Sequence, residues 1–422
     1  MRVCLVTLDF APFRSSGLTI YAENLARGLA ERGHQVTVIA ADRSQSHRVD
    51  DVPIPSGIRV LRMPIGRLDW IGLGWQAARY LRSRCADFDV VHFADVHFAY
   101  AFRSPFVASA FQSFRQRLTS HHGRPYHTGW RNYIFRRLYY SVARQVMECP
   151  SLRRARHLLM SSQATQREFV RHYRVDPSRT TVVYLGIDLK RFQALPEQKK
   201  ARRQLGLPLD VPILLYVGFS TPRKGVEYLA QALRAVDRSL YLVMVGQWER
   251  GYQRRFLEAL GDAQSRVRLT GYVPDTEKPI YFAAADIFVL PTLLEGFGIP
   301  LVEAMAAGLP IVTTSAGATG EVVGDAGLVV PPGDSQAFAS ALERLLAEPA
   351  LAEQLRQMGP ARARECFDLY DMAARVEEIY RLSSQQADRS QAFSSDPVIG
   401  YKDGDGRCLP VMRRDPQLES SS

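Results

Sequence analysis

The chain has 422 residues, of which 46% are hydrophobic and 23% charged, and its formal net charge is +11. This length and apolar content allow two domains with substantial cores, and they exclude a small single module or a chain that is disordered throughout. The positive charge favours an anionic partner, such as a phosphate-bearing substrate, a membrane surface or a nucleic acid, and does not choose among them.

The cysteines and the N-terminus indicate the compartment. The five cysteines are scattered and form no CxxC pair or Cys/His cluster of the kind that binds zinc. The N-terminal run MRVCLVTLDF reaches Asp9 too soon for the core of a signal peptide, and no apolar run is long enough to cross a bilayer. We therefore expect a cytoplasmic, reducing environment and no structural metal site.

Residues 1–188 alternate between short apolar strands and helical patterns. A strand at 2–10 precedes a polar loop that ends at Gly17, a helix follows that ends near Gly33, and a second strand begins at 35. Further strands are expected at 58–63, 89–94, 105–111, 157–162 and 180–186. Such strand-helix-strand units build a parallel sheet, so this part predicts a Rossmann-like, doubly wound domain.

The alternation then starts again. Residues 189–210 are charged and carry two prolines, which indicates a linker with a short helix, and residues 211–360 predict a second Rossmann-like domain. A helix at 361–382 could cross back to the first domain, and residues 383–422 have the composition of a disordered tail. The predicted fold class is α/β, with two doubly wound domains in tandem.

The most informative stretch runs from Glu295 to Pro310 and reads EGFGIPLVEAMAAGLP. A strand is expected to end just before Glu295, and a helix can begin at Pro300. The loop between them lies where open α/β sheets bind ligands and where the free N–H groups of a helix favour a diphosphate. Gly296 and Gly298 allow the backbone to approach a ligand closely.

This string, with two carboxylates eight positions apart around Gly-Phe-Gly, resembles the donor-site signature of the retaining glycosyltransferases of family 4. The resemblance covers roughly residues 1–382. It implies the GT-B fold, in which two Rossmann-like domains face each other across a cleft. It also implies that Glu295 contacts the transferred sugar, and that Glu303 contacts the nucleotide ribose.

A second element, Gly218-Phe-Ser-Thr-Pro-Arg-Lys-Gly225, follows the first strand of the second domain. A cationic pair on such a loop suits a pyrophosphate, because charge-assisted hydrogen bonds offset the charge that grows on the leaving nucleotide. The segment resembles the family's phosphate clamp, including its Pro-x-Lys-Gly ending. Many members carry Arg directly after the first glycine, where this chain has Phe219, so we expect Arg223 to supply the second charge beside Lys224.

The resemblance is looser in the first domain. Ser15-Ser16-Gly17 stands where the family has paired glycines, of which only Gly17 matches, and Tyr184-Leu-Gly-Ile-Asp188 resembles the family's turn at the domain junction. A family histidine is missing, because its position holds Phe111 or, with a one-residue shift, Gln112. Other side chains that could face the cleft are His92, Asp95, His121 and His122.

Together these residues predict a retaining glycosyltransferase that moves a hexose from a nucleotide-diphosphate sugar to a glycan or lipid-linked acceptor, in polysaccharide or glycoconjugate biosynthesis. The predicted catalytic residues are Glu295, Lys224 and Arg223, and the predicted donor-binding residues are Ser16, Gly17, Arg223, Lys224, Glu295, Gly296, Phe297, Gly298 and Glu303. We expect no metal and no cofactor besides the donor substrate.

Other classes stay open. A sugar-nucleotide epimerase of the same fold or a non-catalytic sugar-nucleotide-binding protein would also carry these motifs. A nucleic-acid-binding protein would explain the charge, although no nucleic acid is expected as partner. An NAD-type dehydrogenase is disfavoured, since no G-x-G-x-x-G follows the first strand.

The segment 103–174 is far more basic than the rest of the chain, because its fourteen arginines face only Glu148 and Glu168. Within it, Ile134, Leu138, Val142 and Val146 recur at i+4 spacing, and Arg137 and Arg144 lie on another helix face. Two interpretations are open. The first is a surface helix whose apolar stripe packs on the domain, and the second is a basic patch that holds the domain against anionic lipid.

Overall fold

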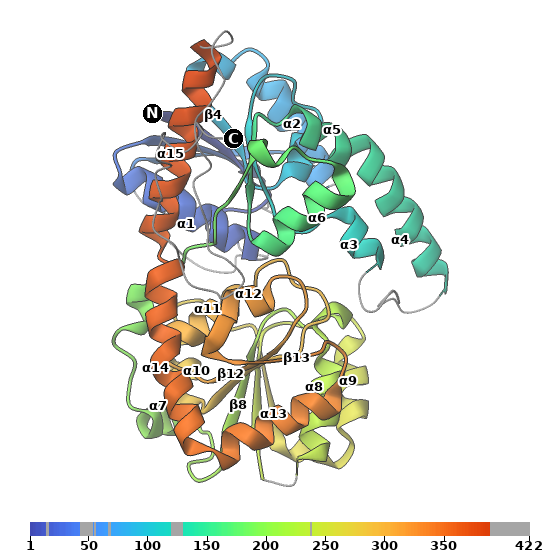
Figure 1. Cartoon of the computed structure of the whole chain (residues 1–422), viewed down its shortest axis with the longest axis vertical. Coiled ribbons are helices and arrows are strands. Elements are labelled where there is room, and N and C mark those ends of the chain that lie inside the picture. Colours follow the sequence, from blue (N-terminus) through green and yellow to red (C-terminus); the bar gives the residue numbers. More distant parts are fainter. Residues whose placement is uncertain are drawn as a thin grey trace, which may run out of the picture.

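The computed structural model describes residues 1–13, 17–42, 54, 56–65, 69–119, 130–236 and 239–388. Ser15, Ser16, His121 and His122 lie outside these described residues, as does most of the predicted tail. We call residues 1–188 the N-terminal half and residues 189–366 the C-terminal half. Each half holds one parallel sheet with helices packed around it, and Figure 1 shows the two halves end to end.

The sheet of the N-terminal half has seven strands in the described residues, in the order β3-β2-β1-β4-β5-β6-β7. The strands are β1 (Arg2–Val6), β2 (Gln35–Ala41), β3 (Ile58–Met63), β4 (Val90–Phe93), β5 (Val107–Ala110), β6 (His157–Met160) and β7 (Thr180–Val182). The helices are α1 (Gly17–Glu31), α2 (Asp69–Leu81), α3 (Phe114–Thr119), α4 (Trp130–Ala143), α5 (Cys149–Arg154) and α6 (Gln163–Tyr173). Central strands such as β1 are apolar on both faces because helices cover both sides of the sheet.

The sheet of the C-terminal half has the order β10-β9-β8-β11-β12-β13. Its strands are β8 (Ile213–Val217), β9 (Tyr241–Val245), β10 (Val267–Gly271), β11 (Ile287–Leu290), β12 (Ile311–Thr314) and β13 (Leu328–Val330). Its helices are α7 (Gln198–Leu205), α8 (Val226–Ala235), α9 (Tyr252–Leu260), α10 (Lys278–Ala284), α11 (Ile299–Ala306), α12 (Thr319–Val323), α13 (Ser335–Ala347) and α14 (Pro349–Cys366). The chain order reverses between β8 and β11, and this switch point is where such sheets bind ligands.

The last helix, α15 (Leu369–Asp388), crosses back to the N-terminal half, where it runs alongside α1 (Figure 1). The sequence pattern placed the start of the returning helix at residue 361, but α14 continues through that position. The break between the two helices falls at residues 367–368, and the returning helix begins at Leu369. Glu377 of α15 pairs with Arg32 and lies 3.4 Å from the ring of His34. Helix α15 therefore stabilises the N-terminal half.

Helix α4 lies at the outer edge of the N-terminal half (Figure 1). Its buried residue Ala143 packs with Met147 and with Phe114 of α3. The stripe Ile134, Leu138, Val142 and Val146 is exposed instead, so the interpretation in which that stripe packs on the domain is wrong.

Two kinds of feature are absent from the described residues. Within them, no helix is long and apolar enough to cross a bilayer. The same residues contain no group of His, Cys, Asp and Glu side chains that could hold a metal ion.

Candidate active site

Glu295 lies on the loop between β11 and α11, at the carboxyl end of a strand beside the switch point. Gly298 ends this loop with a φ of 96°, a left-handed conformation that favours glycine, and its carbonyl accepts from the N–H of Leu301. Helix α11 begins directly after it at Ile299, so the positive end of the helix dipole lies at this loop.

Lys224 forms an ion pair with Glu295, through Nζ and Oε2, and both side chains are about nine-tenths buried. Arg223 approaches the same carboxylate, with Nη1 4.0 Å from Oε1, and donates to the carbonyl of Leu294 at 3.1 Å. Because β8 and β11 are neighbours, the loops that follow them meet at one edge of the sheet. All three residues predicted to be catalytic are thus brought together.

Electrostatics keep Glu295 ionised. Its burial raises the pKa, but the charges of Lys224 and Arg223 outweigh burial and hold the pKa of Glu295 below its ordinary value. Burial in turn lowers the pKa of Lys224 against the opposing effect of Glu295. The site therefore holds a carboxylate among fixed cations.

Two glycines permit the close packing of these loops. Gly225, with a φ of 62°, ends the Pro222–Lys224 turn, and a Cβ there would lie 2.2 Å from the carbonyl oxygen of Pro291. Gly317, with a φ of 66°, lies behind Glu295, whose carbonyl oxygen would be 2.0 Å from an added Cβ. A side chain at Gly225 would push the loop after β8 away from the loop after β11. A side chain at Gly317 would push the loop after β12 away from Glu295.

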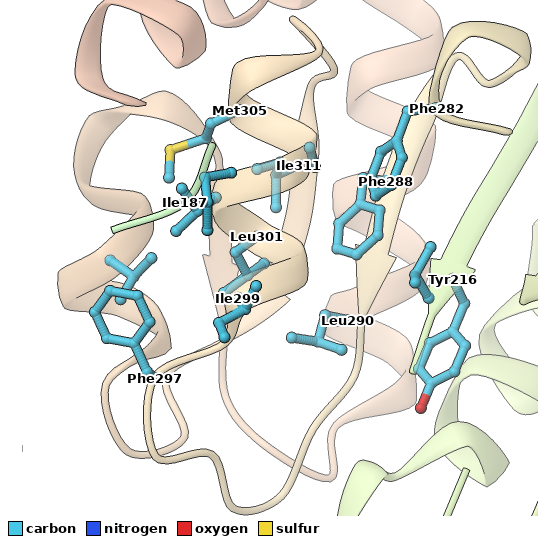
Figure 2. Close-up of a cluster of buried hydrophobic side chains, with 14 of the residues drawn as sticks. Ile187, Tyr216, Phe282, Phe288, Leu290, Phe297, Ile299, Leu301, Met305 and Ile311 are labelled. Atoms are coloured by element: carbon cyan, nitrogen blue, oxygen red, sulfur yellow. The ribbon is translucent and has the colours of Figure 1, made fainter. Parts of the chain in front are cut away.

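Phe297 points into the protein. Its ring packs at 5.7 Å from Phe367 and 6.2 Å from Tyr184, so the loop of Glu295, the turn that begins at Tyr184 and the segment before α15 share one aromatic cluster. Figure 2 shows Phe297 on the same side of α11 as Ile187. The predicted donor contact at Phe297 is thus left to its backbone.

Glu303 lies one turn into α11 and is 3% exposed. Burial raises its pKa, and Lys278, Asp275 and Arg191 are the charged groups close enough to act on it. Lys278 pairs with Asp275. Glu303 thus sits behind the loop of Glu295, within an ionic cluster at the edge of the sheet.

Some polar groups beside these loops are buried without a hydrogen-bond partner in the described structure. They are Thr221 Oγ1 and Trp248 Nε1, on the segments that follow β8 and β9. Figure 2 shows the Tyr216 hydroxyl toward the same end of the sheet as the loop of Phe297. Unpaired buried polar groups are costly, so a polar ligand with oxygen atoms would fit here.

Besides Tyr184, described residues of the N-terminal half approach the loop of Glu295 and the start of α11. A Cβ on Gly17 would lie 3.4 Å from Ile299 Cδ1, and one on Gly296 would lie 3.2 Å from Gln112 Cγ and 3.4 Å from the carbonyl oxygen of Phe111. Ser161 Oγ donates to the carbonyl of Gly296 at 3.3 Å. Phe111 and Gln112, where the family histidine was expected, therefore do face the loop of Glu295.

Of the other candidates, the two that the structure describes, His92 and Asp95, do not reach that loop. His92 is fully buried in the sheet, 2.5 Å from Tyr380 Oη and 2.8 Å from Ser109 Oγ, and burial lowers its pKa to about 3. Asp95 accepts from the N–H of His97, whose ring lies 2.5 Å away. The predictions that His92 or Asp95 face the cleft are wrong, because the interior of the N-terminal half satisfies both.

Sequence reasoning missed three residues that shape the junction: Gly317, Ser161 and Glu321. Glu321, on α12, accepts from the backbone N–H groups of Gln163 and Ala164 at 2.6 and 2.9 Å, and so caps α6 from the opposite half. Only the glycine left a signal, since it lies in the turn Ser-Ala-Gly-Ala-Thr-Gly after a strand.

With this geometry in place, comparison with known proteins decides the family. The family described as "Glycosyltransferase Family 4" matches residues 15–191, and that described as "Glycosyl transferases group 1" matches residues 197–362. The MMP alpha-(1->4)-mannosyltransferase of Mycolicibacterium hassiacum is 30% identical over 428 residues, which cover 90% of this chain and 98% of the relative. The chain belongs to glycosyltransferase family 4. It is a glycosyltransferase. A shorter match, to the O-antigen chain mannosyltransferase B of Escherichia coli, is 36% identical over 156 residues, 36% of this chain and 41% of that protein.

Solved structures of glycosyltransferases share its architecture. Sucrose-phosphate synthase from Thermosynechococcus elongatus superposes with a TM-score of 0.74 at 23% identity, covering 92% of this chain and all of that one. WaaG, a glycosyltransferase involved in lipopolysaccharide biosynthesis, gives 0.70 at 22% identity, covering 90% and 99%. Anabaena HepE in complex with UDP and glucose gives 0.68 at 21% identity, covering 90% and 99%. The fold of this glycosyltransferase is GT-B, with two Rossmann-like domains.

Proposed function

We propose that this glycosyltransferase transfers a hexose, with retention of configuration, from a nucleoside-diphosphate sugar to a hydroxyl of a glycan or lipid-linked acceptor. The observation that carries the proposal is the buried pair of Lys224 and Glu295, with Arg223 beside it, at the amino end of α11. A diphosphate placed there meets two cations and the positive end of the α11 dipole.

In this proposal each residue has its own role. Lys224 and Arg223 bind the diphosphate and offset the charge that grows as the bond between C1 and the phosphate oxygen breaks. Lys224 has three N–H donors, so it can hold a phosphate oxygen and Glu295 together. Glu295 orients the hexose, and Glu303 accepts from the ribose hydroxyls.

The acceptor hydroxyl approaches C1 on the face that the diphosphate leaves. The bond from C1 to the acceptor oxygen forms as the bond to the phosphate oxygen breaks, and the hydroxyl proton passes to the departing diphosphate. The protein contributes mainly position and fixed charge. Gly17, Phe111 and Gln112 bring the N-terminal half against this point, so we place the acceptor between them and the loop of Glu295.

Relatives guide the choice of substrates. Two are named mannosyltransferases, which makes mannose the first hexose to test, and HepE has been solved with UDP-glucose. WaaG acts in lipopolysaccharide biosynthesis, which supports a role in making cell-surface polysaccharide or glycoconjugate. The basic segment 103–174 would bring the enzyme to anionic lipid on the cytoplasmic face of the membrane.

A panel of nucleoside-diphosphate hexoses tests the proposal. A matched donor should raise the melting temperature in proportion to the logarithm of its concentration over Kd. Transfer should then require an acceptor, and NMR of the product should show the anomeric configuration of the donor. Epimerised donor without acceptor would identify an epimerase, and binding with neither transfer nor hydrolysis would identify a binding protein. An inverted product would refute retention.

We also propose that transfer needs no metal ion, because Arg223, Lys224 and the amino end of α11 supply the positive charge. Activity should survive EDTA. Loss of activity on chelation that magnesium or manganese restores would overturn this assignment.

A further inference from the structure

Helix α4 presents a stripe of large apolar side chains to solvent. Phe135 is 69% exposed and Leu138 is 65% exposed, and the stripe consists of Ile134, Phe135, Leu138 and Val142, with the exposed Val146 in the π-helical turn Arg144–Glu148 that follows α4. At 100° per residue these positions fall within about one third of the helix circumference. We call this set the α4 stripe. A contiguous apolar surface of this kind marks an interaction site.

The opposite face of α4 is already packed, which fixes the direction of the stripe. Ala143, Met147 and Phe114 form a small core with Tyr140 against them. At the end of α4, Glu148 accepts from the N–H of Phe114 at 3.0 Å, lies 3.0 Å from His97 Nε2 and receives the hydroxyl of Tyr173. These contacts anchor the α3–α4 hairpin, so the stripe cannot turn inward without breaking them.

Charge around the stripe has one sign. The segment 103–174 contains fourteen arginines and two acidic residues, and both acidic side chains are turned inward. Glu148 is fully buried beside His97, and Glu168, 9% exposed, pairs with Arg115. Arg137, on the exposed side of α4, lies over the ring of Tyr133. The surface that carries the stripe is therefore basic and aromatic.

We propose that α4 is an interfacial membrane helix, which inserts the α4 stripe among the acyl chains of an anionic bilayer while the arginines beside it contact lipid phosphates. An apolar face flanked by arginines and tyrosines is suited to the headgroup boundary, where both kinds of side chain are satisfied. An acidic protein would complement the arginines alone, and a second copy of this chain would bring like charges together. An anionic bilayer complements both the apolar stripe and the arginines beside it.

The role that we give to this membrane contact, which is to bring the enzyme to a lipid-linked acceptor, rests on the proposed function. Helix α3 begins two residues after Gln112, which faces the loop of Glu295. An acceptor anchored in the bilayer under α4 would thus be held close to the site of transfer.

The test is co-sedimentation of the full chain with vesicles of phosphatidylcholine alone or with phosphatidylglycerol, at low and high salt. Wild type should bind the anionic vesicles and keep part of that binding at high salt, because salt screens the arginines and not the apolar contact. The triple variant Phe135→Ser, Leu138→Ser, Val142→Ser should bind at least about tenfold more weakly. The double variant Leu209→Ser, Val329→Ser removes exposed apolar side chains from the C-terminal half and should bind like wild type.

Equal binding of the triple variant and wild type would overturn the proposal. So would self-association of wild type without lipid that the triple variant abolishes, because that would assign the stripe to a second copy. Folding is checked independently with Phe135→Trp, whose added fluorescence should be quenched by brominated lipid; no quenching would also refute insertion. Donor hydrolysis without vesicles should be the same in wild type and the triple variant, so a failure of the enzymatic proposal is seen separately.

Discussion

The two halves of this glycosyltransferase both bury ionised groups, but for different purposes. In the C-terminal half, Lys224 and Glu295 pair at the carboxyl edge of the sheet, where we propose that the donor binds. In the N-terminal half, His97 lies between Asp95 and Glu148, and this triad fastens the α3–α4 hairpin to the domain. Asp95 follows the carboxyl end of β4, just as Glu295 follows that of β11, so a buried charge at a strand end does not by itself identify a catalytic site.

The largest expected effect is on turnover at the Lys224–Glu295 pair of the C-terminal half. Glu295→Gln keeps the shape of the side chain but removes its charge, so we expect kcat at saturating donor to fall about 100- to 1,000-fold. Steady-state kinetics measure this, with a melting curve to confirm folding. Glu353→Gln, on the exposed face of α14, is the matched control and should retain wild-type turnover. Wild-type kcat in Glu295→Gln would remove Glu295 from the site.

The second largest effect is expected on the affinity for the donor. Lys224→Ala and Glu303→Ala each remove a charged partner of the diphosphate or ribose, worth about 1.5–3 kcal/mol, so donor Kd should rise roughly 10- to 150-fold. Isothermal titration calorimetry measures the change, and Lys200→Ala, an exposed lysine of α7, serves as control. If neither variant changes Kd, the donor lies elsewhere.

The C-terminal half was predicted well from sequence because its signals are local. The sequence predicted loops around Gly225 and Gly298, and the structure places both glycines in left-handed positions, at a turn and at a helix start. The local sequence pattern could not predict the ion pair between Lys224 and Glu295. That pair depends on β8 and β11 being neighbours, and strand order is a property of the whole sheet.

The N-terminal half was predicted less well, because its contacts join distant segments. His97 and Glu148 are 51 residues apart, and nothing in the sequence around either one indicates the other. The periodicity correctly predicted that α4 carries its apolar stripe and Arg137 on different faces. It could not decide which face packs, since that depends on where Phe114 and Met147 lie.

The third prediction concerns pH and stability in the N-terminal half. Burial opposes protonation of His97, but Asp95 and Glu148 outweigh it and raise its pKa from 6.5 to about 9. A raised pKa means that the folded state holds the proton more tightly, so this contribution is complete below pH 6.5 and is lost as pH rises through 9. The melting temperature of wild type should therefore fall by a few degrees more than that of His97→Gln between these values.

His157 provides the control for that slope. Burial lowers its pKa to about 4, so His157 is neutral in both folded and unfolded states well above pH 6.5. His157→Gln should thus keep the wild-type dependence between pH 6.5 and 9. Parallel slopes for wild type and His97→Gln would show that the triad contributes nothing through its proton.

The smallest predicted effect lies where the halves meet. Glu321 of α12 accepts from two N–H groups at the start of α6, and Tyr184 Oη donates to it at 3.0 Å. Its neighbour Ala318 donates to the carbonyl of Glu295, 3.4 Å away, so this contact between the halves is continuous with the donor loop. A carboxylate at a helix N-terminus is favoured by the helix dipole and by the free N–H groups.

Glu321→Gln should therefore weaken the closed arrangement of the halves by about 1 kcal/mol, since the amide keeps one acceptor oxygen but loses the charge and the second contact. Small-angle X-ray scattering should show a larger radius of gyration for the variant without donor. If the donor binds the closed arrangement, its apparent Kd should rise about fivefold, with kcat at saturation unchanged because the loop of Glu295 is intact. Glu353→Gln should leave both quantities at their wild-type values. A variant with the wild-type scattering profile would mean that Glu321 caps α6 without holding the halves together, and the comparison would then rest on the two buried charge clusters alone.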